Sequence, residues 1–579
     1  MTVTLDVASS TSIDGATGCS SGSSGVTSFG SIPAGTKYVS SGTCTIEFGS
    51  TNDTSMLLAY QSDQGGVAGW SPTVGDLDTS FSSGDGSDGV AYVDFAGNAD
   101  VADDIAVMDD GRIVLGGYTD GGSHNMAAAR LLADGTPDNS FNTNGRSEIS
   151  FAAGDDDAWA ADVQSDDKVV LCGSTAGGAR MSLMRMTAGG LIDNSFGGTG
   201  KVQPTFNNTD WCGDVIAMDD GRILAVGGTW DTVDNDIAVA RLLSDGQLDP
   251  DFGTGGRYVL DYESANEREA AEAAAIQPDG KIVVVAHSEF YGDVLVARLN
   301  ENGTVDNSFG GGWARFDMGG GVDEVAAVRL QEDGKVVIFG FTDAAGNDDM
   351  YVARLLATGG FDPSFGGGNG YVAIPVGSGN DKALDGIIQP DGSYLIAGTA
   401  YGANDDVAVA RVLEDGTLDD SFGTAGIATY DLSGASDTGR ALAFTRDGRL
   451  LVAGTAANAT SDMMVFQLDQ LDQFDDYADG STDWDAGRST FGACLDGVGL
   501  GATVDVDTWV TTGSCTSVDT DPWNAIAPDA TDPSAVIAKA PTSVDTAVAQ
   551  IRFGVRTAAD QQTGRYMAPI TFETVAPSL

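Results

Sequence analysis

The sequence holds few of the residues that carry nucleophilic or metal chemistry. Histidine occurs only twice in 579 residues, at His124 and His287, and neither belongs to a recurring group of polar residues. No CxxC pair, GxSxG, HExxH or phosphate-binding loop is present. We therefore predict a protein that is not an enzyme. Carboxylates are abundant, so acid–base hydrolysis stays open as the alternative.

Basic residues and long apolar runs are also scarce. The 28 Lys and Arg stand against 85 Asp and Glu, which gives a formal net charge of −57. Such a chain repels phosphate backbones, so we expect no nucleic-acid partner and a better fit to cations or cationic partners. The Asp surplus also serves turns and solubility. No run approaches the roughly 20 apolar residues of a membrane span, and the first residues lack a signal-peptide pattern, so we expect a mature or trimmed soluble chain without direct membrane insertion.

The six cysteines form two sets. Four lie near the ends of the chain, at Cys19, Cys44, Cys494 and Cys515. We predict that these four form disulfides, which implies an oxidising, extracellular or cell-surface location. Local pairing (Cys19 with Cys44, Cys494 with Cys515) and pairing between the two ends both stay open. Cys172 and Cys212 occupy non-equivalent places in neighbouring repeats, and we predict that they are buried free thiols.

What the sequence has in quantity is a repeat, present seven times between about residues 76 and 470. A phenylalanine recurs three residues after an aspartate, at Phe81, Phe141, Phe196, Phe252, Phe309, Phe365 and Phe422. In step with it, six of the seven copies carry an Asp-Gly pair followed by an apolar run such as RIVLGG or KVVIFG. Asp-Gly between two apolar runs predicts a tight hairpin joining two strands.

The repeat predicts an all-β fold. Each unit of 55 to 60 residues supplies four short strands and shows no helical periodicity, which is typical of a blade in a seven-bladed β-propeller. An open β-solenoid is the alternative. We place the propeller at residues 71–474. The flanks, 1–70 and 475–579, have strand-like patterns, and we expect them to form one β-sandwich into which the propeller is inserted.

The repeat also resembles a known family. The motifs VARL, LDxSFGxxG and the hairpin run DGKIVV resemble the delta-60 repeat of bacterial secreted and surface proteins, over roughly two thirds of the chain. The resemblance implies a propeller-like domain and brings no established catalytic site. Asn142 and Asp167 depart from the pattern without breaking its period. The flanks resemble β-rich modules of cell-surface proteins that end in a strand like YMAPITFE.

One acid recurs in every copy, eleven residues before the hairpin glycine position, at Asp100, Asp156, Asp210, Glu269, Asp323, Asp381 and Asp437. A second set precedes the last strand of the unit, at Asp236, Asp293, Asp349, Asp406 and Asp462, with Asn125 and Arg180 in the other two copies. The two strands run the same way, so both sets should lie on one face of the disc. Carboxylate oxygens suit Ca²⁺, and the first set is a candidate cation ring. The alternative, which we favour, is hydrogen bonding to N–H groups of the local loop.

A basic residue ends the strand that the second set begins, at Arg130, Arg185, Arg241, Arg298, Arg354 and Arg411. We expect it to form an ion pair between blades with a connector aspartate, and an anion site is the alternative.

These features predict a non-catalytic extracellular surface or structural protein whose propeller acts in adhesion or assembly, through self-association or other surface proteins. Residues 1–9 alternate like an edge strand, which could add to a neighbouring subunit's sheet in a pilus-like filament; pairing within the chain is the alternative. The rival function is a secreted hydrolase with its site in the propeller's central funnel. Two funnel carboxylates that differ from the repeat consensus favour the hydrolase, and a uniform acidic ring favours binding.

Overall fold

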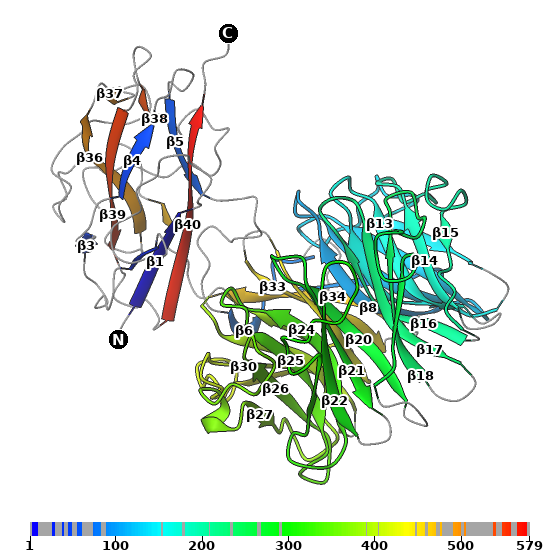
Figure 1. The fold of residues 1–579 in the computed structure, drawn as a ribbon. Helices are drawn as coiled ribbons and strands as arrows, with labels where there is room; N and C mark the ends of the chain where they lie inside the picture. Colours follow the sequence, from blue (N-terminus) through cyan, green and yellow to red (C-terminus); the bar gives the residue numbers. More distant parts are fainter. Residues whose placement is uncertain are drawn as a thin grey trace. The chain divides into compact units, whose positions relative to one another are not determined.

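The computed structural model describes the repeat region with short gaps and the strands of both chain ends (Figure 1). In the repeat region it covers residues 73–82, 89–151, 154–175, 180–207, 209–231, 235–262, 268–288, 292–389, 391–402, 404–445, 448–457 and 461–470. The chain forms two compact units, one of residues 75–445 and 450–469, the other of residues 1–74, 446–449 and 470–579. None of the helices among the described residues is long and apolar enough to cross a membrane.

The larger unit is built from four-stranded antiparallel sheets. The first three are β8 (Ala99–Val107), β9 (Ile113–Asp120), β10 (His124–Leu131) and β11 (Arg146–Ile149); β12 (Asp156–Val163), β13 (Val169–Thr175), β14 (Met181–Met186) and β15 (Lys201–Val202); and β16 (Thr209–Ala217), β17 (Ile223–Trp230), β18 (Asn235–Leu242) and β19 (Arg257–Leu260). The next three are β20 (Glu269–Ile276), β21 (Ile282–Ser288), β22 (Asp293–Leu299) and β23 (Trp313–Phe316); β24 (Asp323–Leu330), β25 (Val336–Thr342), β26 (Asp349–Leu355) and β27 (Tyr371–Ile374); and β28 (Lys382–Ile388), β29 (Tyr394–Ala400), β30 (Asp406–Val412) and β31 (Ile427–Tyr430). A short 3-10 turn, η1 (Gly366–Gly368), precedes β27.

The seventh sheet joins the two ends of the repeat region. Its strands are β32 (Asp437–Phe444), β33 (Leu450–Ala457) and β34 (Ser461–Gln470), with β6 (Thr73–Leu77) and β7 (Val90–Val93) from the start of the region. Ala91 of β7 lies opposite Val465 of β34. The ring is therefore closed by strand pairing between segments more than 350 residues apart, and the predicted seven-bladed propeller is confirmed.

The order of strands within a blade differs from the order along one sequence repeat. The strand after the phenylalanine connector, such as β11, is the outermost strand of the blade already formed. The acid-bearing strand that follows in the sequence, such as β12, begins the next blade and contacts the first strands of both neighbouring blades. The segment after the outermost strand thus crosses from one blade to the next, and the buried core lies between successive sheets.

The recurrent arginine, aspartate and phenylalanine form one buried unit in most blades. Arg130 Nε lies 2.7 Å from Asp138 Oδ2, and the guanidinium lies over the Phe141 ring, 4.7 Å from its centroid. The expected aspartate partner is confirmed, but it belongs to the same repeat, eight residues later. The link to the next blade is a hydrogen bond that Arg130 donates to the carbonyl of Ala188.

The smaller unit contains two sheets, and each combines strands from both ends of the chain. One has the order β2 (Val26–Ser28), β1 (Val3–Ser9), β40 (Gly564–Val575), β5 (Ser55–Tyr60), β38 (Val536–Lys539) and β37 (Thr503–Val504). The other contains β3 (Lys37–Val39), β39 (Ala547–Arg556), β36 (Thr490–Gly499) and β35 (Asp475–Asp476), with β4 (Cys44–Phe48) also on β39.

The strand β1 is not the edge strand that the sequence predicts. It pairs in parallel with β40 over seven residues and antiparallel with β2 on its other side. A pairing with a neighbouring subunit would therefore have to replace one of these contacts.

The predicted terminal disulfides lie largely outside the described residues, which include neither Cys19 nor Cys515. The backbones of Cys44 and Cys494 are described, and they lie on opposite sides of β39, facing Ile551 and Arg552. Local pairing and pairing between the two ends both remain predictions.

Candidate functional site

The seven recurrent acids begin the innermost strand of each blade, and all are buried. In five of them a carboxylate oxygen accepts a hydrogen bond from the backbone N–H five residues earlier: Asp100, Asp156, Asp323, Asp381 and Asp437. This is the local loop bonding expected from the sequence, although the donor precedes the acid instead of following it as in an Asx-turn. Asp210 likewise accepts the N–H groups of Phe206 and Asn207, so these acids each hold the loop that leads into their own strand. The seven therefore do not converge on one ring of ligands.

The first and second acid sets do meet across individual blade junctions. Asp462, Asp94 and Asp100 place carboxylate oxygens within 4.8 Å of one another, as do the equivalent residues Asp293, Asp317 and Asp323. These are the described residues that could hold a cation. In the junction where the second set has arginine, Arg180 Nη1 lies 3.5 Å from Asp210 Oδ2. Arg315 similarly pairs with Asp293 at 2.9 Å.

The central channel carries a different set of residues. In each innermost strand a β-bulge interrupts the register three residues after the recurrent acid. The bulge residues around the ring are Asp103, Trp159, Gly213, Glu272, Ala326, Leu384 and Arg440. No two are of the same type, and all seven line the channel. Bulges commonly redirect side chains near functional sites.

These residues frame a pocket of about 560 Å³ at the channel mouth, within the size range of ligand sites. Its wall is completed by residues from other strand positions, among them Trp211, Glu324 and Phe341. The Trp159 side chain is 38% exposed. Trp211 lies against Gly228, where an added Cβ would meet the indole at 2.1 Å. The mouth therefore combines indole rings with carboxylates.

Two groups of ionisable side chains contact one another at the channel mouth. Arg440 Nη1 lies 2.9 Å from Asp103 Oδ1, across the junction between the last and first blades. Burial raises the pKa of Asp103 to about 6, while the guanidinium opposes that rise. His287 Nδ1 lies 3.1 Å from Glu272 Oε1 and 3.6 Å from Glu324 Oε2.

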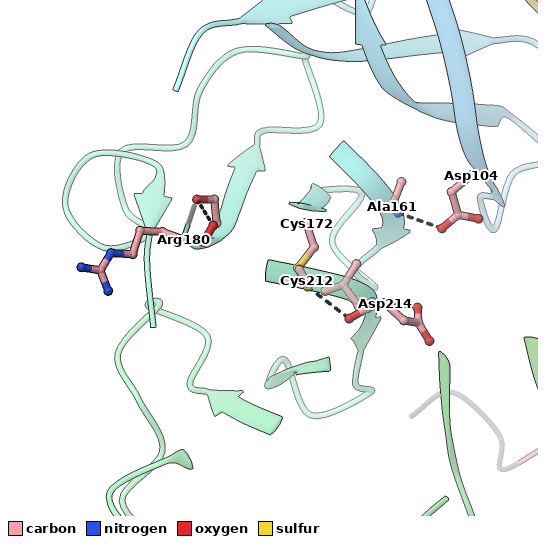
Figure 2. Close-up of a disulfide and its surroundings, with 8 residues drawn as sticks. Asp104, Ala161, Cys172, Arg180, Cys212 and Asp214 are labelled. Carbon is pink, nitrogen blue, oxygen red and sulfur yellow. Dashed lines mark hydrogen bonds between the residues drawn. A yellow bond between two sulfur atoms is a disulfide. The ribbon is translucent and has the colours of Figure 1, made fainter. Parts of the chain in front are cut away.

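Deeper in the channel, buried aspartates tie each innermost strand to the next. Asp104 Oδ2 accepts the N–H of Ala161 at 2.8 Å (Figure 2), and Asp214 Oδ2 accepts that of Ala274 at 2.9 Å. Burial raises the pKa of Asp214 to about 6. Arg329 Nη2 lies 2.7 Å from Asp385 Oδ1 in the same layer. These carboxylates hold neighbouring blades together below the pocket.

The prediction of free thiols at Cys172 and Cys212 is wrong. The two residues form a disulfide between β13 and β16, with their Cα atoms 5.8 Å apart (Figure 2). Their positions are not equivalent because the second strand of one blade packs against the first strand of the next. A residue on the second strand of one blade meets a residue on the first strand of the next blade. Two cysteines that bridge neighbouring blades must therefore occupy different positions of the repeat.

The recurrent residues of the repeat do not predict the channel mouth, because the residues that line the mouth differ from one repeat to the next. A signal was present in the register. The position three residues after the recurrent acid holds seven different residue types, although the position that follows it holds only Ala or Asp. The position directly after the recurrent acid, which includes Trp211 and Glu324, also holds seven different residue types. His287 has no such signal, because only the contact between blades four and five brings it to Glu324.

The fold and its repeats define the class of protein. The larger unit is a seven-bladed β-propeller with four-stranded blades. Six segments match the family model described as "Domain of unknown function (DUF5122) beta-propeller", at residues 109–141, 164–196, 219–252, 277–309, 331–365 and 389–422. The propeller is thus built from DUF5122 beta-propeller repeats. No curated protein gives a significant match to the chain.

Several solved structures are similar to this chain at low identity. A catalytically inactive virginiamycin B lyase from Staphylococcus aureus with quinupristin is 12% identical, with 65% of this chain and 98% of that one covered and a TM-score of 0.40. Hydrazine synthase from Kuenenia stuttgartiensis is 14% identical, with coverage of 63% and 94% and a TM-score of 0.39. A family PL25 ulvan lyase is 12% identical, with coverage of 65% and 96% and a TM-score of 0.37.

Proposed function

We propose that the protein is a non-catalytic extracellular or cell-surface protein whose propeller captures a partner at the mouth of its channel, in adhesion or assembly. The observation that carries this proposal is the pocket at the channel mouth, which is lined by seven bulge residues of different types together with Trp211, Glu324 and Phe341. The delta-60 resemblance and the surface-protein pattern of the flanks support the same function.

The location is part of the proposal. A disulfide between blades two and three fits an oxidising compartment, as do the four terminal cysteines if they pair. In this account the two mixed sheets of the smaller unit pack as a β-sandwich that carries the propeller.

Beads coated with the protein test the function. Wild-type beads should adhere to the producing cells or to one another, and the Trp159→Ala/Trp211→Ala variant should lose most of that adhesion. Trp230→Ala is the matched control, because Trp230 is 42% exposed at the end of β17 and does not line the pocket. Full adhesion by a folded double variant would refute the proposal.

Filament assembly is the second arm of the proposal, through exchange of β1 between subunits. Exchange would require β1 to leave β40 and β2 of its own chain. Deletion of residues 1–9 should leave the propeller folded and abolish polymers seen by electron microscopy. Polymers that persist after the deletion would rule out this route.

A hydrolase is the rival function, and one observation favours it. The mouth is not a uniform acidic ring, and Glu272 and Glu324 both approach His287 within 3.6 Å, so two non-consensus carboxylates lie in one pocket. Turnover of a polysaccharide or peptide panel that is lost in Glu272→Gln would establish the rival. An inactive wild-type protein that still adheres through the pocket would exclude it for those substrates.

A further inference from the structure

The mouth pocket has a chemistry that selects among ligands. Its described lining holds three carboxylates, Asp103, Glu272 and Glu324, against one guanidinium, Arg440, and that guanidinium is already paired with Asp103. Beneath the pocket, Arg329 pairs with Asp385, and burial raises the pKa of Asp104 and Asp214, so the charge of the pocket is set by its own lining. A cleft of one sign attracts ligands of the other, so anionic ligands are disfavoured here.

The aromatic wall points to the same kind of ligand. The faces of indole rings attract cations more strongly than other aromatic side chains do, and Trp159 and Trp211 both line the pocket. Between Trp159 and Glu272, the intervening blade has Gly213 at the bulge. A Cβ at that position would lie 2.5 Å from the carbonyl oxygen of Ala271. The glycine thus lets the innermost strands of blades three and four approach each other closely at this point of the pocket wall.

Beside the pocket, one ammonium group of the protein itself contacts both an aromatic ring and a carboxylate. Lys382 Nζ lies 4.6 Å from the centroid of the Phe341 ring and 3.5 Å from Asp348 Oδ2. Phe341 is itself part of the pocket wall. An aromatic face together with one carboxylate oxygen is therefore a working ammonium site in this part of the propeller.

Resting on the proposed binding function, we infer that the pocket binds a linear alkylammonium group, as found on a lysine side chain or a polyamine. The ammonium lies at Glu272, whose side chain is 36% exposed, and the alkyl stem lies along Trp159 and Trp211. Ammonium is favoured over guanidinium because His287 Nδ1 already lies 3.1 Å from Glu272 Oε1, so the imidazole crowds the two-oxygen fork that a guanidinium uses best.

Calorimetric titration of the full-length protein tests this inference. The probes are acetyl-Gly-Lys-Gly-amide, its Nζ-acetylated form, spermidine and a neutral chitopentaose. We expect saturable binding of the lysine peptide, of spermidine or of both, and none of the acetylated peptide. Binding of the peptide alone would identify a polypeptide source, and binding of spermidine alone a polyamine.

Variants assign the binding to the pocket. Glu272→Gln should weaken the affinity roughly 10- to 100-fold, as expected for loss of a charge-assisted hydrogen bond. Trp159→Ala should weaken it roughly 2- to 30-fold, whereas Trp159→Phe should retain most of the affinity. Trp230→Ala and Glu332→Gln are the controls, because both residues are exposed outside the pocket. Unchanged melting temperatures show that each variant is folded.

Three results would overturn the inference: equal binding of the acetylated peptide, binding of chitopentaose alone, or equal weakening by Glu332→Gln and Glu272→Gln. The last would indicate general attraction to an acidic protein. If beads still need Trp159 and Trp211 for adhesion while no amine binds, the ligand class is wrong and the proposed function stands. If adhesion is also independent of Trp159 and Trp211, both the inferred ligand class and the proposed function are wrong.

Discussion

Arg241 Nε lies 2.7 Å from Asp249 Oδ2, and both side chains are almost fully buried. The same guanidinium lies over the Phe252 ring and donates a hydrogen bond to the carbonyl of Glu301 in the next blade. One repeated residue therefore joins its own connector to the following blade, which explains why the arginine, the aspartate and the phenylalanine recur together.

Arg241→Ala should lower the free energy of unfolding by up to about 3 kcal/mol, because the buried Asp249 then keeps only the longer ion pair with Arg222, 3.6 Å away. Urea unfolding measures the loss. The double variant Arg241→Met/Asp249→Asn should lose less than the single variant, since no charge is left unpaired. Equal losses in the two would show that the ion pair is not the source of the effect.

The Cys172–Cys212 disulfide should stabilise the junction between blades two and three. It spans 40 residues, and constraint of the unfolded chain by such a loop contributes about 4 kcal/mol at most. Reductant should lower the melting temperature of the wild type more than that of Cys172→Ala/Cys212→Ala, which controls for the other cysteines. Alkylation of Cys172 in unreduced, denatured protein would contradict the bridge.

The propeller should become more stable as the pH falls from 7 to about 5. Burial raises the pKa of Asp162 and Asp214 to about 6, so the folded protein binds these protons more tightly than the unfolded chain. For Asp214 alone this corresponds to roughly 3 kcal/mol. Below about pH 4 the trend should reverse, because hydrogen bonds and Arg298 hold the pKa of Asp306 at about 2.

Melting temperatures of the wild type and Asp214→Asn across pH 4 to 8 measure this effect. The asparagine keeps an acceptor for the Ala274 N–H but cannot titrate, so the variant should gain less stability on acidification. Identical pH profiles for the two proteins would contradict the assigned role of Asp214.

Closure of the ring by the start of the repeat region gives another prediction. Val90 of β7 is buried in the cluster that contains Phe466 and Leu468 of the last blade. Val90→Asp should cost roughly 3 kcal/mol or more, because it buries a carboxylate among apolar side chains. Val259→Asp is the matched control, since Val259 is exposed on another outer strand, β19, and calorimetry should show little change. Equal effects would argue against the closure.

The fold was predictable because its determinants are local and repeated. Asp-Gly hairpins and the Asp–Phe connector act within a few residues, and seven copies make the pattern clear. The assignment of outer strands to blades was harder to predict, because β7 and β34 are adjacent in the last blade but lie at opposite ends of the repeat region in the sequence. The site escaped prediction because contacts such as Asp103 with Arg440 join residues more than 300 positions apart, at a position where the repeat varies.

Carboxyl footprinting tests the central claim most directly, that partners bind at the channel mouth. Glu272 and Glu324 should be labelled in the free protein and protected when the protein is bound to the surface to which its beads adhere. Glu332, in an exposed hairpin, should be labelled equally in both states. Protection of Glu332 with unchanged labelling of Glu272 and Glu324 would place the binding surface elsewhere and contradict the account.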